Sequence, residues 1–384
     1  MLKKFSPLIW LSSLGAGGIS VIFFAFLNYT IPHGKGLINI SQIHSAYSGL
    51  ALAGFMFLEA LMVVFILLHF ALTLQLIPKL LAWIKTPYYK ELLDNPLANA
   101  AILAPFISIT MSMNVLIGPI RYLFVPLAEN LQSMMLPGFL VWSLIWIALM
   151  RMEIKLLKIS FEKGFDVDKV NFGWLLHPFA LGMLSVTGAG IAAMASNIVL
   201  ANTAFFMLLV SGSMGLFLLL VKSVAIFKSH FASDGLPAKQ FLPSLLIIVP
   251  NITLYAITFF RVGHFLEHHH GAQLGSYFFV VMTLAFAFET WYLMFGLALL
   301  KDYFTTHMKT EYHVSQWGLV CPFVAYAVLG SFVYNLFLPY TLFFWFILAV
   351  TAFTISLFFF ILFKQYLCLK SAKSSANEPK LMCA

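Results

Sequence analysis

The side chains best suited to chemistry in this sequence stand directly before prolines. His177 precedes Pro178, and Cys321 precedes Pro322. An imidazole beside a thiol lowers the thiol pKa and yields a reactive thiolate, and the same two groups can bind a soft ligand or metal ion. The alternatives are an inert buried cysteine and a hydrogen-bonded helix histidine, and the sequence leaves them open.

These two prolines belong to a series with a nearly constant interval. Pro105, Pro178, Pro250 and Pro322 are separated by 73, 72 and 72 residues. Each lies in a long apolar stretch, where proline removes a backbone donor and bends a helix. The period accommodates two membrane crossings with their loops, so it predicts a repeated helical hairpin with a kink in its first helix. Phenylalanine follows three of the prolines, at Phe106, Phe179 and Phe323.

Composition identifies the solvent around these hairpins. Hydrophobic residues make up 61% of the 384 residues and charged residues 9%, whereas soluble domains carry about 25% charged residues. Apolar runs of about 20 residues recur, each long enough to cross a bilayer, and they exclude the short alternating strands of a β-barrel. We therefore predict an all-α polytopic membrane protein whose first apolar run is a retained span and not a signal peptide.

The apolar runs predict ten transmembrane helices, over residues 6–30, 46–77, 97–118, 131–151, 172–197, 203–227, 241–262, 275–300, 315–336 and 340–367. With the N-terminus in the cytoplasm, all but three of the 22 lysines and arginines fall in cytoplasmic segments, as the positive-inside rule requires. The exceptions are Lys35, Arg121 and Arg261. The net charge of +8 is then explained by orientation and contact with anionic lipid, and no nucleic-acid partner is needed.

This topology places every repeated proline on an odd-numbered span that runs outward from the cytoplasm. Pro7, early in the first span, is the fifth member of the series. We predict five parallel-repeat hairpins around a central pseudo-five-fold pathway. Small and hydroxyl residues in the first, third and fifth spans suit the wall of a pathway and close helix packing equally. Residues 1–370 form the transmembrane domain, and 371–384 a disordered cytoplasmic tail.

The ten-span, five-hairpin layout resembles the SLAC1/TehA-like group of plant anion channels, bacterial tellurite-resistance proteins, and dicarboxylate and sulfite exporters. The segment Trp317-Gly-Leu-Val-Cys321-Pro322 matches that group's Trp-x-x-x-Phe-Pro pattern in spacing. In the group the phenylalanine plugs the pore, so the thiol of Cys321 means that this gating mechanism does not carry over. The segments 170–194 and 316–331 are also similar to TsoY-type (seleno)proteins, with Cys321 as the candidate selenocysteine position. The resemblance implies a homotrimer.

Other polar residues allow weaker hypotheses. Arg121 and Arg261 stand near the outer ends of inner spans, where they either draw anions into a vestibule or anchor to headgroups. His264 and His268 share a helical face that suits Zn or Cu, but no cysteine completes a ligand set, and a solvated outer loop is favoured.

Three polar residues lie at membrane depth on even-numbered spans. Glu59, His69 and Glu289 are expected to bridge helices or contact a neighbouring subunit, with a proton relay as the less favoured role.

We expect an inner-membrane channel or secondary transporter for small anionic solutes, because no phosphate-binding glycine loop, ATPase motif or hydrolase triad is present. No cofactor is expected. The alternative is a membrane-embedded thiol redox protein that uses Cys321 with His177, which leaves open whether the chain is an enzyme. Cys368 and Cys383 fall in cytoplasmic segments, so no structural disulfide is expected.

Overall fold

The computed structural model describes residues 5–34, 36–233, 235–373 and 382–383. Ten of its helical segments are long and apolar enough to cross a membrane. They cover Pro7–Thr30, Gly49–Trp83, Asn99–Leu123, Leu131–Lys163, Phe172–Met194, Ile198–Ala232, Lys239–His270, Gly275–Leu299, Val314–Leu336 and Thr341–Lys370. These confirm the ten predicted spans, and the chain fits a polytopic membrane protein.

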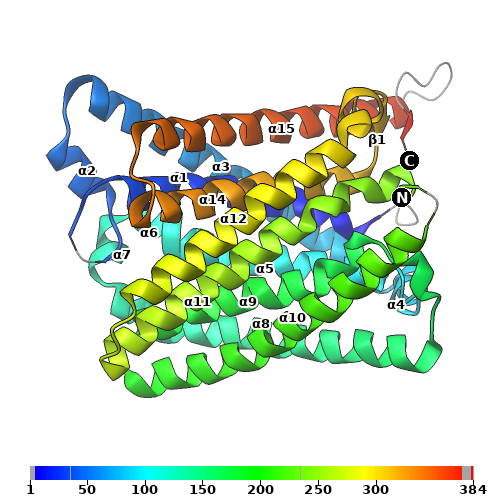
Figure 1. The fold of residues 1–384 in the computed structure, drawn as a ribbon, viewed down its shortest axis with the longest axis horizontal. Coiled ribbons are helices and arrows are strands. Elements are labelled where there is room, and N and C mark those ends of the chain that lie inside the picture. The colour runs from blue at the N-terminus through cyan, green and yellow to red at the C-terminus, as the bar shows by residue number, and fades with distance from the viewer. Residues whose placement is uncertain (1–4, 35, 234, 374–381, 384) are drawn as a thin grey trace.

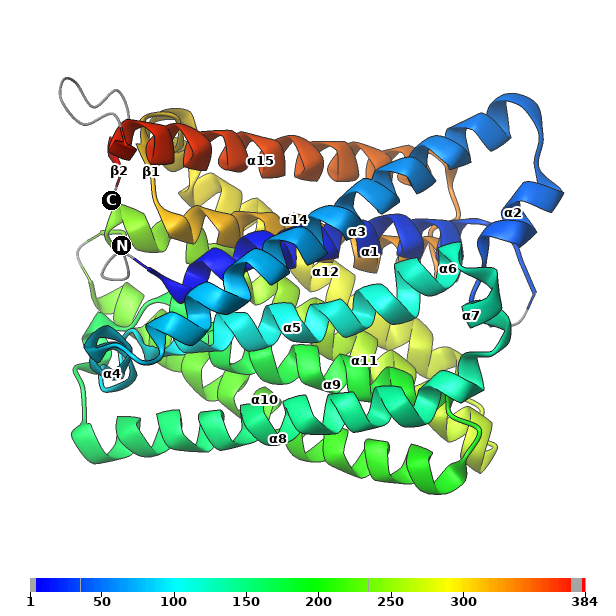
Figure 2. The ribbon, with the colours of Figure 1, turned by 180° about the vertical axis from the view of Figure 1, so that it is seen from behind.

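The main α-helices of these segments lie roughly along one direction (Figures 1 and 2). They are α1 (Trp10–Thr30), α3 (Gly49–Trp83), α5 (Ala104–Val115), α8 (Leu131–Lys163), α9 (Leu176–Met194), α10 (Ile198–Ala232), α11 (Ile248–His270), α12 (Gly275–Leu299), α14 (Val320–Leu336) and α15 (Thr341–Lys373). Shorter helices join them: α2 (Ile40–Ala46), α4 (Pro87–Leu93), α6 (Arg121–Leu123), α7 (Val125–Glu129) and α13 (Met308–Thr310). A π-helical turn over Leu116–Ile120 links α5 to α6.

Burial separates the long helices into two sets. Every residue in the most apolar stretch of Phe172–Met194 is buried, against 22% of the corresponding stretch in Gly49–Trp83. In the other odd-numbered segments most of this apolar stretch is buried, whereas in the other even-numbered segments most of it is not. Large side chains of the second set project outward, such as Leu342, which is 83% exposed. We call α1, α5, α9, α11 and α14 the inner helices.

The inner helices form a closed ring. α1 packs against α5 and α14, α9 packs against α5 and α11, and α11 packs against α14. Glycines bring neighbouring members close together: a Cβ added to Gly18 of α1 would lie 2.8 Å from Val324 of α14. The even-numbered helices cover this ring from outside, with α3 on α1, α10 on α9, α12 on α11 and α15 on α14. α8 packs against both α5 and α9.

Each repeated proline lies near the start of an inner α-helix, and not in its middle. Short 3₁₀ segments precede the α-helices, and Pro105 is the second residue of α5. Pro178, Pro250 and Pro322 are each the third residue of their helix, while Pro7 begins the 3₁₀ turn before α1. The prolines thus stand at or beside the junction between a 3₁₀ segment and an α-helix, where proline suits the first helical turn, and the kink in each first helix stays a prediction. We call the end of the ring where the inner helices begin the proline end.

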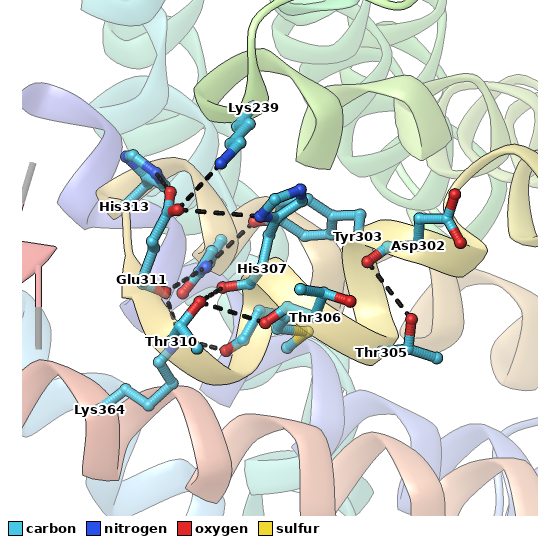
Figure 3. A network of polar contacts seen from close by, with 12 residues as sticks. Lys239, Asp302, Tyr303, Thr305, Thr306, His307, Thr310, Glu311, His313 and Lys364 are labelled. Atoms are coloured by element: carbon cyan, nitrogen blue, oxygen red, sulfur yellow. Dashed lines mark hydrogen bonds and ion pairs between the residues drawn. The ribbon is translucent and has the colours of Figure 1, made fainter.

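A polar network joins the segment after α12 to two distant parts of the chain (Figure 3). Glu311, in the short strand β1 (Glu311–Tyr312), accepts from Nζ of Lys239 at 3.1 Å and lies 3.3 Å from Nε2 of His313. Nζ of Lys364 on α15 donates to the carbonyls of Met308 and Glu311. These contacts fix the connection between α12 and α14 at the proline end.

The C-terminal region departs from expectation in two places. β1 pairs in parallel with β2 (Met382–Cys383). Cys368 is disulfide-bonded, so the prediction that no disulfide forms is wrong. The predicted disordered tail falls mostly on residues outside the described part of the chain, as do Lys3, Lys4, Lys35 and Lys380 of the charge count.

Candidate solute cavity

A cavity of about 130 Å³ lies inside the ring, and all five inner helices contribute to its wall. Most of the wall is apolar, including Leu14, Phe24, Met183, Leu254, Val324 and Phe332. Along α11 the wall extends from Pro250 to Arg261, a rise of about 16 Å for eleven helical residues. The lining residues of α11 therefore span about half the thickness of the hydrocarbon core of a bilayer.

Arg261 is the one residue with a formal charge among the described residues that line the cavity. No carboxylate in the described part of the chain forms an ion pair with it. Gly190 of α9 leaves room for its guanidinium, because an added Cβ would lie 2.3 Å from Nη1. An unpaired guanidinium in an apolar cavity attracts an anion more strongly than it would in water.

The remaining polar groups of the wall are uncharged. The hydroxyl of Thr187 donates to Oδ1 of Asn114 at 3.0 Å, which joins α9 to α5. Thr253 donates to Oε1 of Glu289 at 2.5 Å, so this carboxylate lies behind the wall on α12. Tyr29 of α1 lines the same cavity as Arg261. The wall can thus offer hydroxyl and amide groups to a small polar solute.

Cys321 lines the cavity and is 6% exposed, whereas His177 turns away from it. Nδ1 of His177 lies 2.6 Å from Oε2 of Glu153 on α8, and both side chains are fully buried. The structure thus does not bring Cys321 and His177 together as a thiol–imidazole pair. The chemistry expected of such a pair has no support in the geometry.

Residues of the proline series differ in what they contact. Pro250 and Phe179 line the cavity. Phe323 points away from it, with its ring 4.8 Å from that of Phe353 on α15. The other members, which do not line this cavity, are Pro7, Pro105, Phe106, Pro178 and Pro322.

The two arginines proposed for an outer vestibule have different surroundings. Arg121 is buried, and its Nη2 donates to the carbonyl of Ile38 at 2.6 Å. It therefore ties α6 to the loop after α1, while Arg261 faces the cavity.

The histidine run continues α11 and does not form a loop, since the helix extends to His270. His264 lies 3.2 Å from Glu267, and His268 contacts the ring of His269. Among the described residues no group of three or more His, Cys, Asp or Glu side chains is placed to hold a metal ion.

The polar residues on outer helices bridge neighbouring helices. Tyr122 donates to Glu59 at 2.5 Å, and Nε2 of His44 lies 2.9 Å from the same carboxylate. His69 of α3 lies between Ser13 of α1 and Ser112 of α5. These contacts agree with the bridging role expected for such residues.

Three buried charged residues were missed by the sequence interpretation. Glu153 is fully buried, and Lys222 and Lys364, which the charge count assigned to the cytoplasm, are each 3% exposed. The signal for Lys222 was present, since it lies within the apolar run 214–227 with no other charge nearby.

Comparisons with family profiles and with curated proteins find no match to this chain.

Proposed function

We propose that this protein is a channel or secondary transporter that moves small anions through the cavity inside the ring. The observation that carries the proposal is Arg261, an unpaired guanidinium in an otherwise uncharged cavity wall. A fixed positive charge with apolar walls concentrates anions and repels cations. The amide N–H₂ of Asn114 and the hydroxyl of Tyr29, which also line the cavity, can donate to a small anion in place of part of its hydration shell.

The proposed architecture is five helical hairpins repeated in one orientation about a pathway along the membrane normal. It is supported by the closed ring of inner helices, by the 3₁₀ segment that precedes each of them, and by the proline in that segment or in the first turn of the helix. Parallel repeats of this kind place a solute site on their common axis. The resemblance to SLAC1/TehA-like proteins, and to their TsoY-type branch, remains part of this proposal.

Location and orientation follow from the same proposal. The excess of lysine at the proline end supports a cytoplasmic position for that end and for both termini, in a bacterial inner membrane. The apolar outer helices then face lipid, or a second copy in a homotrimer.

Flux in proteoliposomes tests the function. Purified protein should give uptake of at least one anion from a panel of nitrate, sulfite, selenite, tellurite and malate. Arg261→Gln should lower that uptake by about tenfold or more, because it removes the attracting charge. The matched control is Arg151→Gln, an exposed arginine of α8, which should leave uptake unchanged. A protein that moves none of these anions is not an anion transporter.

The competing function is thiol redox chemistry at Cys321, whose thiol lies in the cavity wall while the expected partner His177 contacts Glu153. Replacement of Cys321 by serine separates the two functions. Redox chemistry predicts complete loss of function, whereas a place in the cavity wall predicts a changed rate or selectivity with flux retained.

A further inference from the structure

A buried cluster of ionisable side chains lies between α8, α9 and α10, behind the cavity wall. It contains the Glu153–His177 pair and Lys222, whose Nζ lies 4.2 Å from the centre of the Trp174 ring. Lys222 is close enough to Glu153 to interact electrostatically, yet no ion pair within 4.0 Å joins these two residues. Three ionisable groups from three helices thus share apolar surroundings, where each charge is costly unless it is compensated.

The hydrogen bonding of this cluster is incomplete. Four of its buried polar atoms have no partner among the described residues: Oε1 of Glu153, Nε2 of His177, Nζ of Lys222 and Nε1 of Trp174. Buried polar atoms in native proteins nearly always have a partner. These atoms therefore have donor and acceptor sites with which the cluster can bind an exchangeable proton.

The chemistry of the pair identifies a position for a proton. An ionised Glu153 only accepts, so in that state of the pair Nδ1 of His177 carries the proton and Nε2 of the neutral ring keeps a basic lone pair. With Glu153 ionised and Lys222 charged, the cluster is then neutral. One more proton at Nε2 gives it a net charge of +1 without breaking the existing hydrogen bond.

The cluster is close to the cavity along the chain. Phe179, two residues after His177, lines the cavity. The carbonyl of Pro178 accepts from the hydroxyl of Tyr255 at 2.8 Å, and Leu254 beside that tyrosine lines the cavity as well. A positive charge on His177 therefore lies behind residues that line the cavity, in apolar surroundings that screen its attraction for a cavity anion only weakly.

We propose that Glu153, His177 and Lys222 form a proton-binding site that takes up one proton at Nε2 of His177 when an anion occupies the cavity, so that proton and anion cross together. This inference rests on the proposed anion transport. The proton enters from solvent on one side and leaves to solvent on the other, and only an N–H bond forms and breaks. Because the three side chains are buried, exchange requires the helices to move, which ties proton release to transport and prevents a leak.

The other elements around His177 add few titratable groups. α11 contributes Tyr255, whose hydroxyl is engaged with Pro178. α5 and the 3₁₀ segments Asn99–Leu103 and Phe172–Leu175 contain no titratable residue. Glu153 and Lys222 are therefore the charges that set the proton affinity of this imidazole.

Liposomes loaded with the pH dye pyranine test the coupling. The membrane potential is held at zero with potassium and valinomycin, and an inward gradient of nitrate or chloride is imposed, since neither anion carries a proton itself. We expect lumen acidification with about one proton per anion. A one-unit pH gradient, alkaline inside, should drive about tenfold accumulation of either anion.

The variants His177→Gln and Glu153→Gln should retain anion flux down a gradient and lose the acidification. Glu162→Gln, on an exposed carboxylate of the same helix α8, is the matched control and should stay coupled. Flux of nitrate or chloride without acidification in the unmodified protein would overturn this inference and leave the proposed transport intact. If no anion moves at all, both proposals fail.

A second measurement needs no transport. Trp174 lies against Lys222, so the fluorescence difference between the unmodified protein and Trp174→Phe in detergent should report a pH transition of the cluster. By linkage, an anion in the cavity favours proton binding, so chloride should move this transition to higher pH relative to gluconate at the same ionic strength. His177→Gln should abolish the transition, and a transition that ignores chloride would overturn the proposal.

Discussion

Nη1 of Arg261 occupies the space in which any residue other than glycine at position 190 would place its Cβ. An added Cβ would lie 2.3 Å from Nη1 of the arginine, which is the far end of a flexible side chain. Gly190→Ala should therefore leave the fold intact and displace the guanidinium. We expect a several-fold loss of anion flux with unchanged thermal stability, measured in the proteoliposome assay and by unfolding in detergent.

Gly138→Ala is the matched control for this prediction. Gly138 lies on α8, and nothing stands within 4 Å of an added Cβ there. If Gly190→Ala transports anions as fast as the control does, the position of Arg261 is not important for flux.

Gly188 of α9 allows a test of how closely α8 and α9 pack, without any change of charge. A Cβ on Gly188 would lie 2.3 Å from the indole of Trp142, which is fully buried and donates to the carbonyl of Leu184 at 3.0 Å. The ring has no room to move, so Gly188→Ala should destabilise the protein by about 1–3 kcal/mol through overpacking.

Thermal unfolding in detergent measures this effect. Gly54→Ala on α3, which meets no neighbour within 4 Å, should be neutral or slightly stabilising because alanine favours a helix more than glycine does. Equal stability of the two variants would mean that α8 and α9 do not pack as described.

Cys321 predicts a chemical test of the cavity. Because its thiol lies in the wall, a negatively charged methanethiosulfonate reagent should add a sulfonate to the pathway and lower anion flux several-fold. Cys321→Ser should transport and resist the reagent. Unchanged flux after complete labelling of Cys321, verified by mass spectrometry, would exclude the cavity as the route.

Glu311 gives a pH dependence outside the membrane-spanning segments. The hydrogen bond from Lys239, and then that from His313, holds the pKa of Glu311 below its usual range. The folded pKa lies below the unfolded value of about 4.3, so the stabilisation is fully present above that value and is lost as the pH falls through the folded pKa. Thermal stability of the protein should fall over this interval.

Glu311→Gln should remove that part of the pH dependence. The same change at Glu91, an exposed carboxylate of α4, should not alter the slope. Identical pH profiles for both variants would show that the network of Figure 3 contributes nothing to stability.

The sequence predicts the ten spans well because the length of each apolar run can be counted directly in the sequence. Their ends are less accurate where a helix outlasts its apolar run. α8 continues to Lys163 and α11 to His270, through charged and histidine-rich sequence that hydropathy assigns to loops. The position of each proline within its helix could not be predicted either, since an apolar run does not reveal where a 3₁₀ segment ends and the α-helix begins.

Side-chain direction was the part of the site that sequence could not supply. His177 and Cys321 both precede a repeated proline, but the direction of a side chain depends on how its helix is rotated about its own axis. Side chains two residues apart on a helix point in directions that differ by about 200°. Thus Phe179 lines the cavity while His177 turns to Glu153. Lys222 was missed for a related reason, because a charge count along the chain cannot distinguish a buried lysine from one in solvent.

The shared direction of the inner helices has a further electrostatic effect. All five begin at the proline end, so the partial positive charges of their first turns gather around one mouth of the ring (Figure 2). Each helix dipole contributes about half an elementary charge there. This field arises from peptide groups, so the replacement of Arg261 leaves it in place and the mouth at the proline end stays favourable for anions.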